Sequence, residues 1–311
     1  MSTATPDIDA QGPPEGPPPW LDDTLQQRIE WRDGDVVVSV PPKSGTTWTM
    51  NIVHQLRSGG DSSFADVYAE VPWLEIVPRP DSDRDDLVAA FDAMPHHRRR
   101  AFKTHAAPPV LPYHRPGEGL DVRYVVVARN PDEAVASFRP FIASHSDAWF
   151  DLWQVPRDGL VGPDIEAYFA GIGSHAIVPM IFGFLEAWWP LRHEPNVLLV
   201  HYADLKRAPE ASIRGIASFL GFEVTEAQWP AILEYTSFGW MKAHEDKFEL
   251  RSVTDPPILD PGAMIRRGQV GASVDDGITP AISGAIAEMG RTILTDPRAF
   301  EWCYAGGAVP A

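Results

Sequence analysis

The sequence predicts an α/β fold: a single doubly wound domain with a central parallel sheet. Three apolar runs, at residues 36–40, 122–128 and 196–205, are typical of buried strands. Each is followed by a segment with a helix-starting or helical pattern, and polar residues that could bind a ligand stand directly after the strands. Ligands of open α/β sheets bind at the carboxyl ends of the strands, so we expect the functional site at that edge.

The composition supports one large domain and limits its partners. The chain has 311 residues, 44% of them hydrophobic, which is enough to bury a full core. Its 26 basic and 43 acidic residues give a net charge of -17, which disfavours nucleic acid and anionic membranes as partners. An anionic ligand would therefore need a local cluster of basic residues.

The cysteine content and the N-terminus bear on where the protein works. The single cysteine, Cys303, excludes an internal disulfide and a thiolate metal cluster. The N-terminus carries acids and prolines where a signal peptide needs a basic start and an apolar core, so we expect a cytoplasmic protein. Residues 1–19 predict a flexible, proline-rich tail, and the folded domain is expected over residues 20–311. The apolar stretch at 176–191 is interrupted by a proline and a glutamate and is too short to span a membrane.

The first strand leads into a segment that can hold an anion. The valines of residues 36–40 end at two prolines, and the next residues are Lys43-Ser44-Gly45-Thr46-Thr47-Trp48. The serine and threonines can supply capping hydroxyls, the glycine allows close approach of the backbone, and the first-turn N–H groups point outward with the helix dipole behind them. Lys43 adds a mobile positive charge, which suits a phosphate or sulfate group.

Two other interpretations of this segment compete. An ordinary strand-to-helix turn often uses glycine, serine and threonine. A nucleoside triphosphatase loop would carry its lysine late, after a second glycine and beside a hydroxyl for magnesium. Here Lys43 precedes the only glycine of the segment, so the triphosphatase interpretation fails. The order Pro-Lys-Ser-Gly-Thr-Thr-Trp instead resembles the 5'-phosphosulfate loop of the cytosolic-type sulfotransferases, which use 3'-phosphoadenosine 5'-phosphosulfate (PAPS).

A second short strand is expected to end near Lys103 and His105. On an extended segment these two side chains project to one face, because one residue lies between them. The two adjacent histidines before them face different ways and make a poor metal pair, and the arginines at 98–100 are typical of a solvated turn. A lone histidine is more often structural, but Lys-Thr-His here resembles the family's segment that carries its catalytic histidine.

The strand at 122–128 is followed by Arg129 and a predicted helix start. Asn130 is a good N-cap, with a proline at the first helical position and Glu133 placed as in a capping box. Ser137 lies about two turns into that helix. Alone, Arg129 and Ser137 would be a plain surface arginine and a plain helix serine. Together they resemble the family's arginine and serine that contact the 3'-phosphate of the nucleotide.

Later motifs carry the resemblance, in the family's order, as far as about residue 268. Tyr202 stands at the end of the third apolar run, where the family has Tyr-Glu-Asp. Thr236-Ser237-Phe238 resembles the family's Thr-Ser-Phe, which implies that Phe238 flanks adenine opposite Trp48. The resemblance also implies that the 3'-phosphate is wrapped by Arg266, Arg267 and Gly268, and bidentate arginine suits a phosphate.

The resemblance implies a PAPS-dependent sulfotransferase that moves a sulfuryl group to a hydroxyl or amine of a small molecule or lipid. His105 would be the general base, since histidine titrates near neutrality, and Lys43 and Lys103 would stabilise the leaving group and transition state. No bound metal is expected. Two alternatives stay open. A P-loop-type kinase would need magnesium and a triphosphate-length loop, and a non-catalytic nucleotide-binding module would not require His105 beside Lys103.

The resemblance weakens after Gly268. Residues 269–275 depart from the family's usual Gly-Asp-Trp-Lys and lack its short dimer motif. A homodimer that uses this motif is therefore not expected, while a homodimer of another kind stays open.

Overall fold

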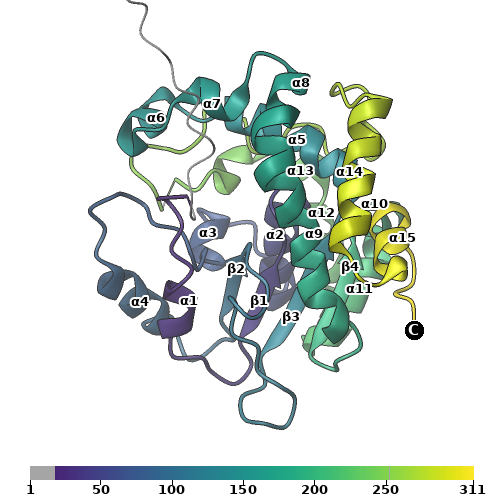
Figure 1. The fold of residues 1–311 in the computed structure, drawn as a ribbon. Helices are drawn as coiled ribbons and strands as arrows, with labels where there is room; N and C mark the ends of the chain where they lie inside the picture. The colour runs from purple at the N-terminus through teal and green to yellow at the C-terminus, as the bar shows by residue number, and fades with distance from the viewer. Residues whose placement is uncertain (1–17, 252) are drawn as a thin grey trace, which may run out of the picture.

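A four-stranded parallel sheet forms the centre of the molecule. The computed structural model describes residues 18–251 and 253–311, so most of the predicted tail at 1–19 lies outside the described residues. The strand order is β2-β1-β3-β4 (Figure 1). The strands are β1 (Val36–Ser39), β2 (Ala101–Thr104), β3 (Arg123–Ala128) and β4 (Val197–His201). The prediction of a parallel α/β sheet is confirmed.

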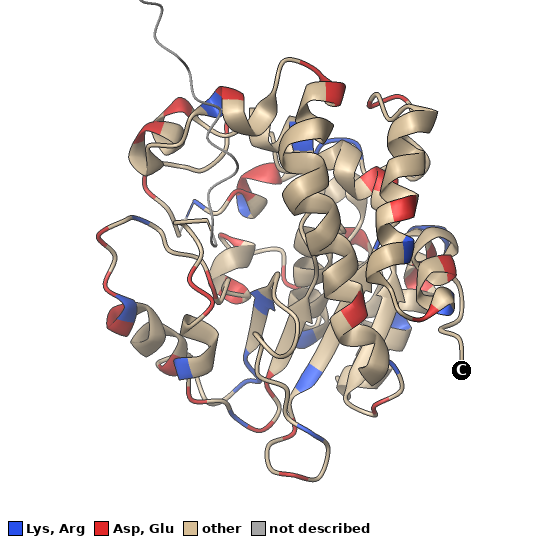
Figure 2. Cartoon of the chain, viewed as in Figure 1, with Lys and Arg blue, Asp and Glu red and all other residues tan. Residues whose placement is uncertain are grey.

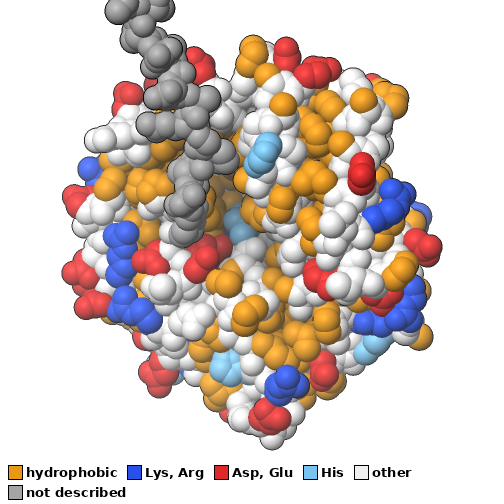
Figure 3. Space-filling view, in the orientation of Figure 1, with side chains coloured by type: hydrophobic (Ala, Val, Ile, Leu, Met, Phe, Trp, Pro, Cys, Tyr) orange, Lys and Arg blue, Asp and Glu red, His pale blue; other side chains and the backbone are white. Residues whose placement is uncertain are grey.

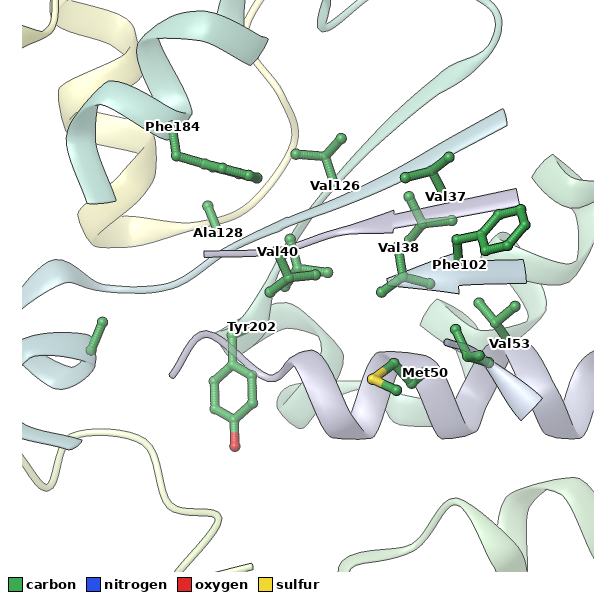
Figure 4. Close-up of a cluster of buried hydrophobic side chains, with 14 of the residues drawn as sticks. Val37, Val38, Val40, Met50, Val53, Phe102, Val126, Ala128, Phe184 and Tyr202 are labelled. Carbon is green, nitrogen blue, oxygen red and sulfur yellow. The ribbon is translucent and has the colours of Figure 1, made fainter. Parts of the chain in front are cut away.

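Helices cover both faces of this sheet, which explains why its inner strands are so apolar. Helix α2 (Thr46–Ser58) packs on one face and α9 (Val178–Trp188) on the other. Figure 4 shows Met50 and Val53 of α2 on one side of the strands and Phe184 of α9 on the opposite side. The valines of β1 are fully buried between these layers. A strand that is covered on both faces needs apolar side chains at every position. Its sequence is therefore a continuous run of β-branched residues, as in β1.

The other helices flank the sheet, and some of them lie around its carboxyl edge (Figure 1). Their bounds are α1 (Leu25–Arg28), α3 (Val67–Glu70), α4 (Arg84–Asp92), α5 (Pro131–Ala143), α6 (Asp147–Trp153), α7 (Arg157–Val161), α8 (Ile165–Tyr168), α10 (Tyr202–Arg207), α11 (Pro209–Leu220), α12 (Trp229–Tyr235), α13 (Phe238–Ala243), α14 (Pro280–Ile293) and α15 (Pro297–Ala305), with the π-helix η1 (Phe169–Ile177) and the 3-10 turns η2 (Trp189–Leu191) and η3 (Glu245–Phe248).

The predicted strand at 196–205 is wrong at its carboxyl end. The strand stops at His201, and Tyr202 begins α10. The cause is a side-chain cap, because the His201 Nδ1 accepts a hydrogen bond from the backbone N–H of Ala203 at 3.2 Å. That bond satisfies a first-turn donor and stops the extended run. Tyr202 is thereby placed at the edge of the sheet.

The apolar stretch predicted at 176–191 belongs to a longer helical run. Elements α8, η1, α9 and η2 are continuous over Ile165–Leu191, 27 residues. Within the described residues, this is the one helical run long and apolar enough to cross a membrane by length and composition, and 44% of its most apolar window is buried. It packs on α14 and α5, as a core helix does. The stretch at 176–191 is therefore part of a longer helical run, and the absence of membrane insertion stays a prediction.

The arginines predicted to form a solvated turn include a buried one. Arg100 is 2% exposed and its guanidinium is bidentate to Asp35, with Nε and Nη2 at 2.9 and 2.6 Å from the two carboxylate oxygens. It also donates to the carbonyl groups of Phe91 and Glu30. This fork closes the amino-terminal end of the sheet, directly before β1 and β2. The prediction of a solvated turn is therefore wrong for Arg100.

We expect Arg100→Met to lower the free energy of unfolding by about 3–5 kcal/mol, because the buried Asp35 carboxylate loses its partner. Chemical denaturation measures this difference. Arg98→Met is the matched control, since Arg98 is 37% exposed in its pair with Glu70 and should cost at most about 1 kcal/mol. Equal losses in the two variants would contradict the role assigned to the Arg100 fork.

Candidate active site

A cavity of about 1020 Å³ opens at the carboxyl edge of the sheet. On the face seen in Figure 3, hydrophobic side chains gather around a hollow. Each strand delivers a residue to it: Lys43 after β1, His105 after β2, Arg129 after β3 and Tyr202 after β4. The predicted site residues that line the cavity are Lys43, Gly45, Thr46, Thr47, Trp48, Lys103, His105, Arg129, Ser137, Tyr202, Phe238, Arg266, Arg267 and Gly268. Ser44 and Thr236 are buried and are not among the lining residues.

The loop between β1 and α2 has donors with no acceptor. Gly45 has φ 99° and Lys43 has φ 64°, so the backbone folds back on itself before the helix. No side chain caps α2, and the predicted capping role of the hydroxyls is wrong. The Ser44 and Thr46 hydroxyls are buried without a partner in the described part of the chain. Together with the free amides of the first helical turn, they fit an anion that supplies several oxygens.

Gly45 is required by close packing as well as by its backbone conformation. A Cβ at this position would lie 2.7 Å from the ring of Tyr202. Tyr202 in turn contacts Trp48, with ring centroids 5.8 Å apart. The glycine therefore lets the loop sit directly against α10.

The ammonium of Lys43 is held in an electropositive, partly buried position. Its Nζ lies 3.9 Å from the centroid of the Phe141 ring. Burial, together with the charges of Arg129 and Arg266, lowers the pKa of Lys43 to about 7. An anion placed among these three groups would restore the charge on Lys43.

Lys103 is the most buried cation of the site. It is 1% exposed, and among the described residues its Nζ has no hydrogen-bond partner. The Nζ lies 2.9 Å from the centroid of the Trp73 ring, whose backbone pairs with that of Lys103. Burial holds the pKa of Lys103 well below its usual range, and Glu75 acts in the opposite direction. An unpaired buried amine is costly, which indicates that a ligand completes this part of the site.

His105 is arranged as a hydrogen-bond acceptor toward the cavity. Its Nδ1 lies 2.6 Å from the carbonyl oxygen of Val40, so Nδ1–H donates there and Nε2 keeps its lone pair. Its backbone N–H donates to the Glu75 carboxylate at 2.6 Å, and its ring packs on Trp73 with centroids 5.0 Å apart. Burial, and then the nearby charge of Lys103, holds the pKa of His105 well below its usual range. The ring is therefore neutral near pH 7.

Arg129 joins the anion loop to the C-terminal segment. Its Nη1 donates to the Lys43 carbonyl at 2.9 Å, and its Nη2 donates to the Gln269 carbonyl at 3.2 Å. Its Nε pairs with Glu133 at 2.9 Å. The other oxygen of Glu133 accepts from the Gly271 N–H, so Glu133 ties two segments together. The expected capping box is half right, because Asn130 caps α5 and Glu133 does not reach back to it.

Arg266 and Arg267 converge on a carboxylate of the same chain. Arg266 donates to both oxygens of Asp276, at 2.8 and 2.5 Å, and Arg267 lies 3.1 Å from one of them. The Arg266 hydrogen bond is the main reason why the pKa of Asp276 is lowered. All three side chains line the cavity. A carboxylate thus sits where these arginines could bind a phosphate.

The aromatic corner of the cavity is built around Trp48. Its indole N–H donates to the Thr236 carbonyl at 2.8 Å, while the Thr236 hydroxyl donates to the Ile232 carbonyl behind the wall. Phe238 is 39% exposed. A Cβ on Gly268 would lie 2.5 Å from the Phe238 ring. The ring therefore packs directly on the backbone of Gly268.

The opposite part of the cavity is mainly apolar. Its walls include Trp73, Phe141, Ile142, Trp149 and Met180. The aromatic segment at 147–153 forms α6, and Trp149 belongs both to the core and to this wall. The cavity therefore combines a group of charged residues with apolar walls, and two rings of these walls, Phe141 and Trp73, contact Lys43 and Lys103.

Several cavity residues were missed from the sequence because only the fold brings them there. Trp73 and Glu75 reach the site through a loop that pairs with β2. Lys206 follows Tyr202 by one helical turn, and its Nζ lies 5.5 Å from the Trp48 ring centroid and 5.7 Å from that of Phe238. Further examples are Tyr68, His145 and Asp276. The spacing of Lys206 after the strand end is the only local signal among them.

Comparison with known proteins gives one family. The family model described as "Sulfotransferase domain" matches residues 33–296. Sulfotransferase 1A1 of Rattus norvegicus is 31% identical over 226 residues, 70% of each chain. The glycolipid sulfotransferase of Mycobacterium bovis is 29% identical over 251 residues, 69% of this chain and 72% of that one.

Solved structures show the same fold. Mouse sulfotransferase SULT7A1 complexed with PAP superposes with a TM-score of 0.65 and 18% identity, over 90% of each chain. Retinol dehydratase in a complex with retinol and PAP gives a TM-score of 0.68 and 19% identity, over 88% of this chain and 84% of that one.

The position of Lys43 predicts a pH dependence for anion binding. Sulfate affinity should fall as the pH rises through about 7, by up to about tenfold per pH unit, because Lys43 then loses its proton in the ligand-free protein. Calorimetry with inorganic sulfate measures this, since sulfate itself does not titrate near neutrality. Lys43→Arg, which stays charged, should give a much flatter profile. A wild-type affinity that does not change across pH 6–9 would contradict this role.

Proposed function

The chain belongs to the sulfotransferase family, and from this membership we propose that it transfers a sulfuryl group from PAPS to an acceptor hydroxyl or amine. The family model covers most of the chain, and the curated relatives are transferases of this family. The protein is therefore an enzyme. We assign the general base to His105 and the donor site to the cationic end of the cavity. The acceptor is a small molecule or lipid.

Two observations support PAPS as the sulfuryl donor. PAP, the bisphosphate that PAPS becomes when its sulfuryl group leaves, is bound in mouse SULT7A1 and in retinol dehydratase. In this chain, the unpartnered hydroxyls and amides of the anion loop suit the 5'-phosphosulfate end. Arg129, Ser137, Arg266, Arg267 and Gly268 would hold the 3'-phosphate. Trp48 and Phe238 would flank the adenine.

The observation that carries the assignment of chemistry is the shared position of Lys103 and His105. Both face one cavity beside the anion loop, one as an unpaired amine and the other as a neutral acceptor. A simple nucleotide-binding module has no use for such a costly pair. A P-loop-type kinase would carry its lysine late in a triphosphate-length loop, whereas Lys43 precedes the glycine of the anion loop.

Each of the three catalytic residues has its own role in the proposed reaction. PAPS supplies the sulfuryl group, whose bond to the 5'-phosphate oxygen breaks as the acceptor oxygen bonds to sulfur. The Nε2 of His105 takes the acceptor proton, because its Nδ1–H is already held by Val40. Lys43 and Lys103 place positive charge on the departing oxygen and on the sulfuryl oxygens. Because the two ammonium groups are poorly hydrated, their charge acts on the ligand with little screening.

The apolar end of the cavity fits an acceptor with a hydrophobic body. The glycolipid sulfotransferase of Mycobacterium bovis is named for a lipid acceptor, and retinol dehydratase binds retinol. Walls of tryptophan, phenylalanine and aliphatic side chains would bury such a body.

We expect His105→Ala to lower turnover by about a hundredfold to ten-thousandfold, because a positioned general base contributes about that much. Binding of adenosine 3',5'-bisphosphate, measured by calorimetry, should stay nearly unchanged. The matched control is His193→Ala, which removes an exposed histidine outside the cavity and should leave both quantities as they are. Near-wild-type turnover of the His105 variant would place the base elsewhere.

Asp276→Asn should tighten the binding of adenosine 3',5'-bisphosphate by about tenfold or more. The change frees Arg266 and Arg267 from a charged competitor for the 3'-phosphate. AMP, which lacks that phosphate, should show no such gain. Asp275→Asn changes the net charge equally at an exposed neighbour and serves as the control. Weaker bisphosphate binding in the Asp276 variant would mean that this carboxylate orients the arginines.

A further inference from the structure

A buried carboxylate lies close to the side chains of Lys103 and His105, and the reaction proposed above gives it no role. Glu75 is 1% exposed and does not line the cavity, so a ligand there would not contact it. A buried carboxylate is costly unless the groups around it compensate for the water that it loses. The contacts of Glu75 therefore indicate which groups it serves.

The loop that carries Glu75 is hydrogen-bonded along β2, an edge strand of the sheet. The Lys103 N–H donates to the Pro72 carbonyl at 2.8 Å, and the Leu74 N–H donates to the Lys103 carbonyl at 2.9 Å. The carbonyl of Glu75 itself accepts from the Asp22 N–H at 2.8 Å. Main-chain bonds to two segments thus fix Glu75 beside the end of β2.

One oxygen of Glu75 orients His105. Its Oε1 accepts a hydrogen bond from the His105 N–H at 2.6 Å, one residue beyond the end of β2. The ring of His105 is fixed separately, because its Nδ1 lies 2.6 Å from the Val40 carbonyl oxygen. Backbone and ring are held by different segments, which sets the direction of Nε2. A neutral amide oxygen could accept the same N–H bond, so this contact alone does not require a carboxylate.

The negative charge of Glu75 acts on Lys103. In the described part of the chain, the Oε2 of Glu75 and the Nζ of Lys103 are both buried and neither has a hydrogen-bond partner. Burial holds the pKa of Lys103 well below its usual range, and the charge of Glu75 raises it. Charges in a poorly hydrated interior interact strongly across a gap. Glu75 therefore favours the ammonium form of Lys103 and leaves the N–H groups of that ammonium for a ligand.

The other charged groups nearby do not replace Glu75. After burial, the charges of Lys103 and Lys43 both hold the pKa of His105 well below its usual range, so His105 is neutral near pH 7 and adds no charge to Lys103. Burial, and then the charge of Glu75, raises the pKa of Asp23, so this acid interacts with Glu75. Among the described residues, Glu75 is the one carboxylate whose charge shifts the pKa of Lys103.

We propose that Glu75 is a positioning residue for sulfuryl transfer. One carboxylate oxygen orients the proposed base His105, and the negative charge keeps Lys103 an ammonium until the anionic donor binds. The inference rests on the proposed function, because Lys103 and His105 have their roles in that reaction. It extends the site beyond the cavity wall, to a group that acts only through two other residues.

The titration of Lys103 tests this role without turnover. Nuclear magnetic resonance of protein with isotope-labelled lysine ε-carbons follows each lysine, and Lys103→Met identifies the Lys103 signal. Glu75→Gln keeps an oxygen for the His105 N–H and removes the charge. Because that charge favours the protonated amine, Lys103 should lose its proton at a lower pH than in the wild type. Asp23→Asn is the matched control, since it removes a charge that acts on Glu75, and should leave this titration in place.

Kinetics with PAPS and a verified acceptor test the consequence for catalysis. Glu75→Gln should lower kcat/KM for PAPS at pH 8 by about tenfold or more, the usual effect of losing one interaction with a charged group. The profile of kcat/KM reports groups of the free enzyme, so its alkaline fall should begin at a lower pH. In a Lys103→Met background, Glu75→Gln should change kcat/KM by less than about twofold, because the amine on which the charge acts is gone.

An unchanged titration of Lys103 in Glu75→Gln would overturn the proposal. A kcat/KM that rises in this variant would overturn it too, by showing that the carboxylate only repels the anionic donor. An equal loss with and without Lys103, or a Glu75→Gln chain that does not fold, would assign Glu75 to the structure alone. Absence of sulfated product from the wild type with any hydroxylic compound would instead contradict the proposed function, and the titration would still decide whether Glu75 acts on Lys103.

Discussion

Positive charge that the protein itself does not neutralise is the constraint on which the site depends. Within the described residues, the Nζ of Lys103 and two hydroxyls of the anion loop have no hydrogen-bond partner, and Lys43 is crowded by Arg129 and Arg266. The chain as a whole carries a net charge of -17, and Figure 2 shows acidic residues scattered over the outer helices and loops. Local geometry therefore has to create the attraction for an anion. Two carboxylates at this end of the cavity pair with its cations: Glu133 with Arg129, and Asp276 with Arg266 and Arg267.

The sheet provides the rigidity that this charged site needs. Parallel strands buried on both faces end at one edge, and each places one side chain into the cavity. At the opposite edge, the Arg100–Asp35 fork closes the starts of β1 and β2. Groups that are costly to bury must be held by elements that cannot relax away from them. Arg129 donates hydrogen bonds to the carbonyl groups of Lys43 and Gln269, and these bonds hold the anion loop and the C-terminal segment against the sheet.

Local sequence patterns predicted the parts of the structure that depend on local physics. The valine run of β1 and the N-cap at Asn130 are examples, because each rests on propensity or capping within a few residues. The roles assigned to His105, Arg266 and Phe238 came from resemblance and stay proposals. Contacts distant in the chain could not be predicted: Trp73 over Lys103, Asp276 between two arginines, and Arg100 beneath the sheet. A polar residue that the sequence predicts to be solvent-exposed can be buried when a residue far away in the chain forms hydrogen bonds with it. A short stretch of sequence does not contain that partner.

The central claim is that the cationic end of the cavity delivers a sulfuryl group to a molecule held in the apolar end. The most direct measurement incubates the protein with PAPS labelled in its sulfate, together with fractionated metabolite and lipid extracts, and follows the label into new products. The account predicts labelled product from fractions that contain apolar hydroxylic or amine compounds, and its near-complete loss with Lys103→Met, which removes the buried ammonium. Label that stays in PAPS in every fraction, while adenosine 3',5'-bisphosphate binds normally, would contradict the account and favour a nucleotide-binding module without catalysis.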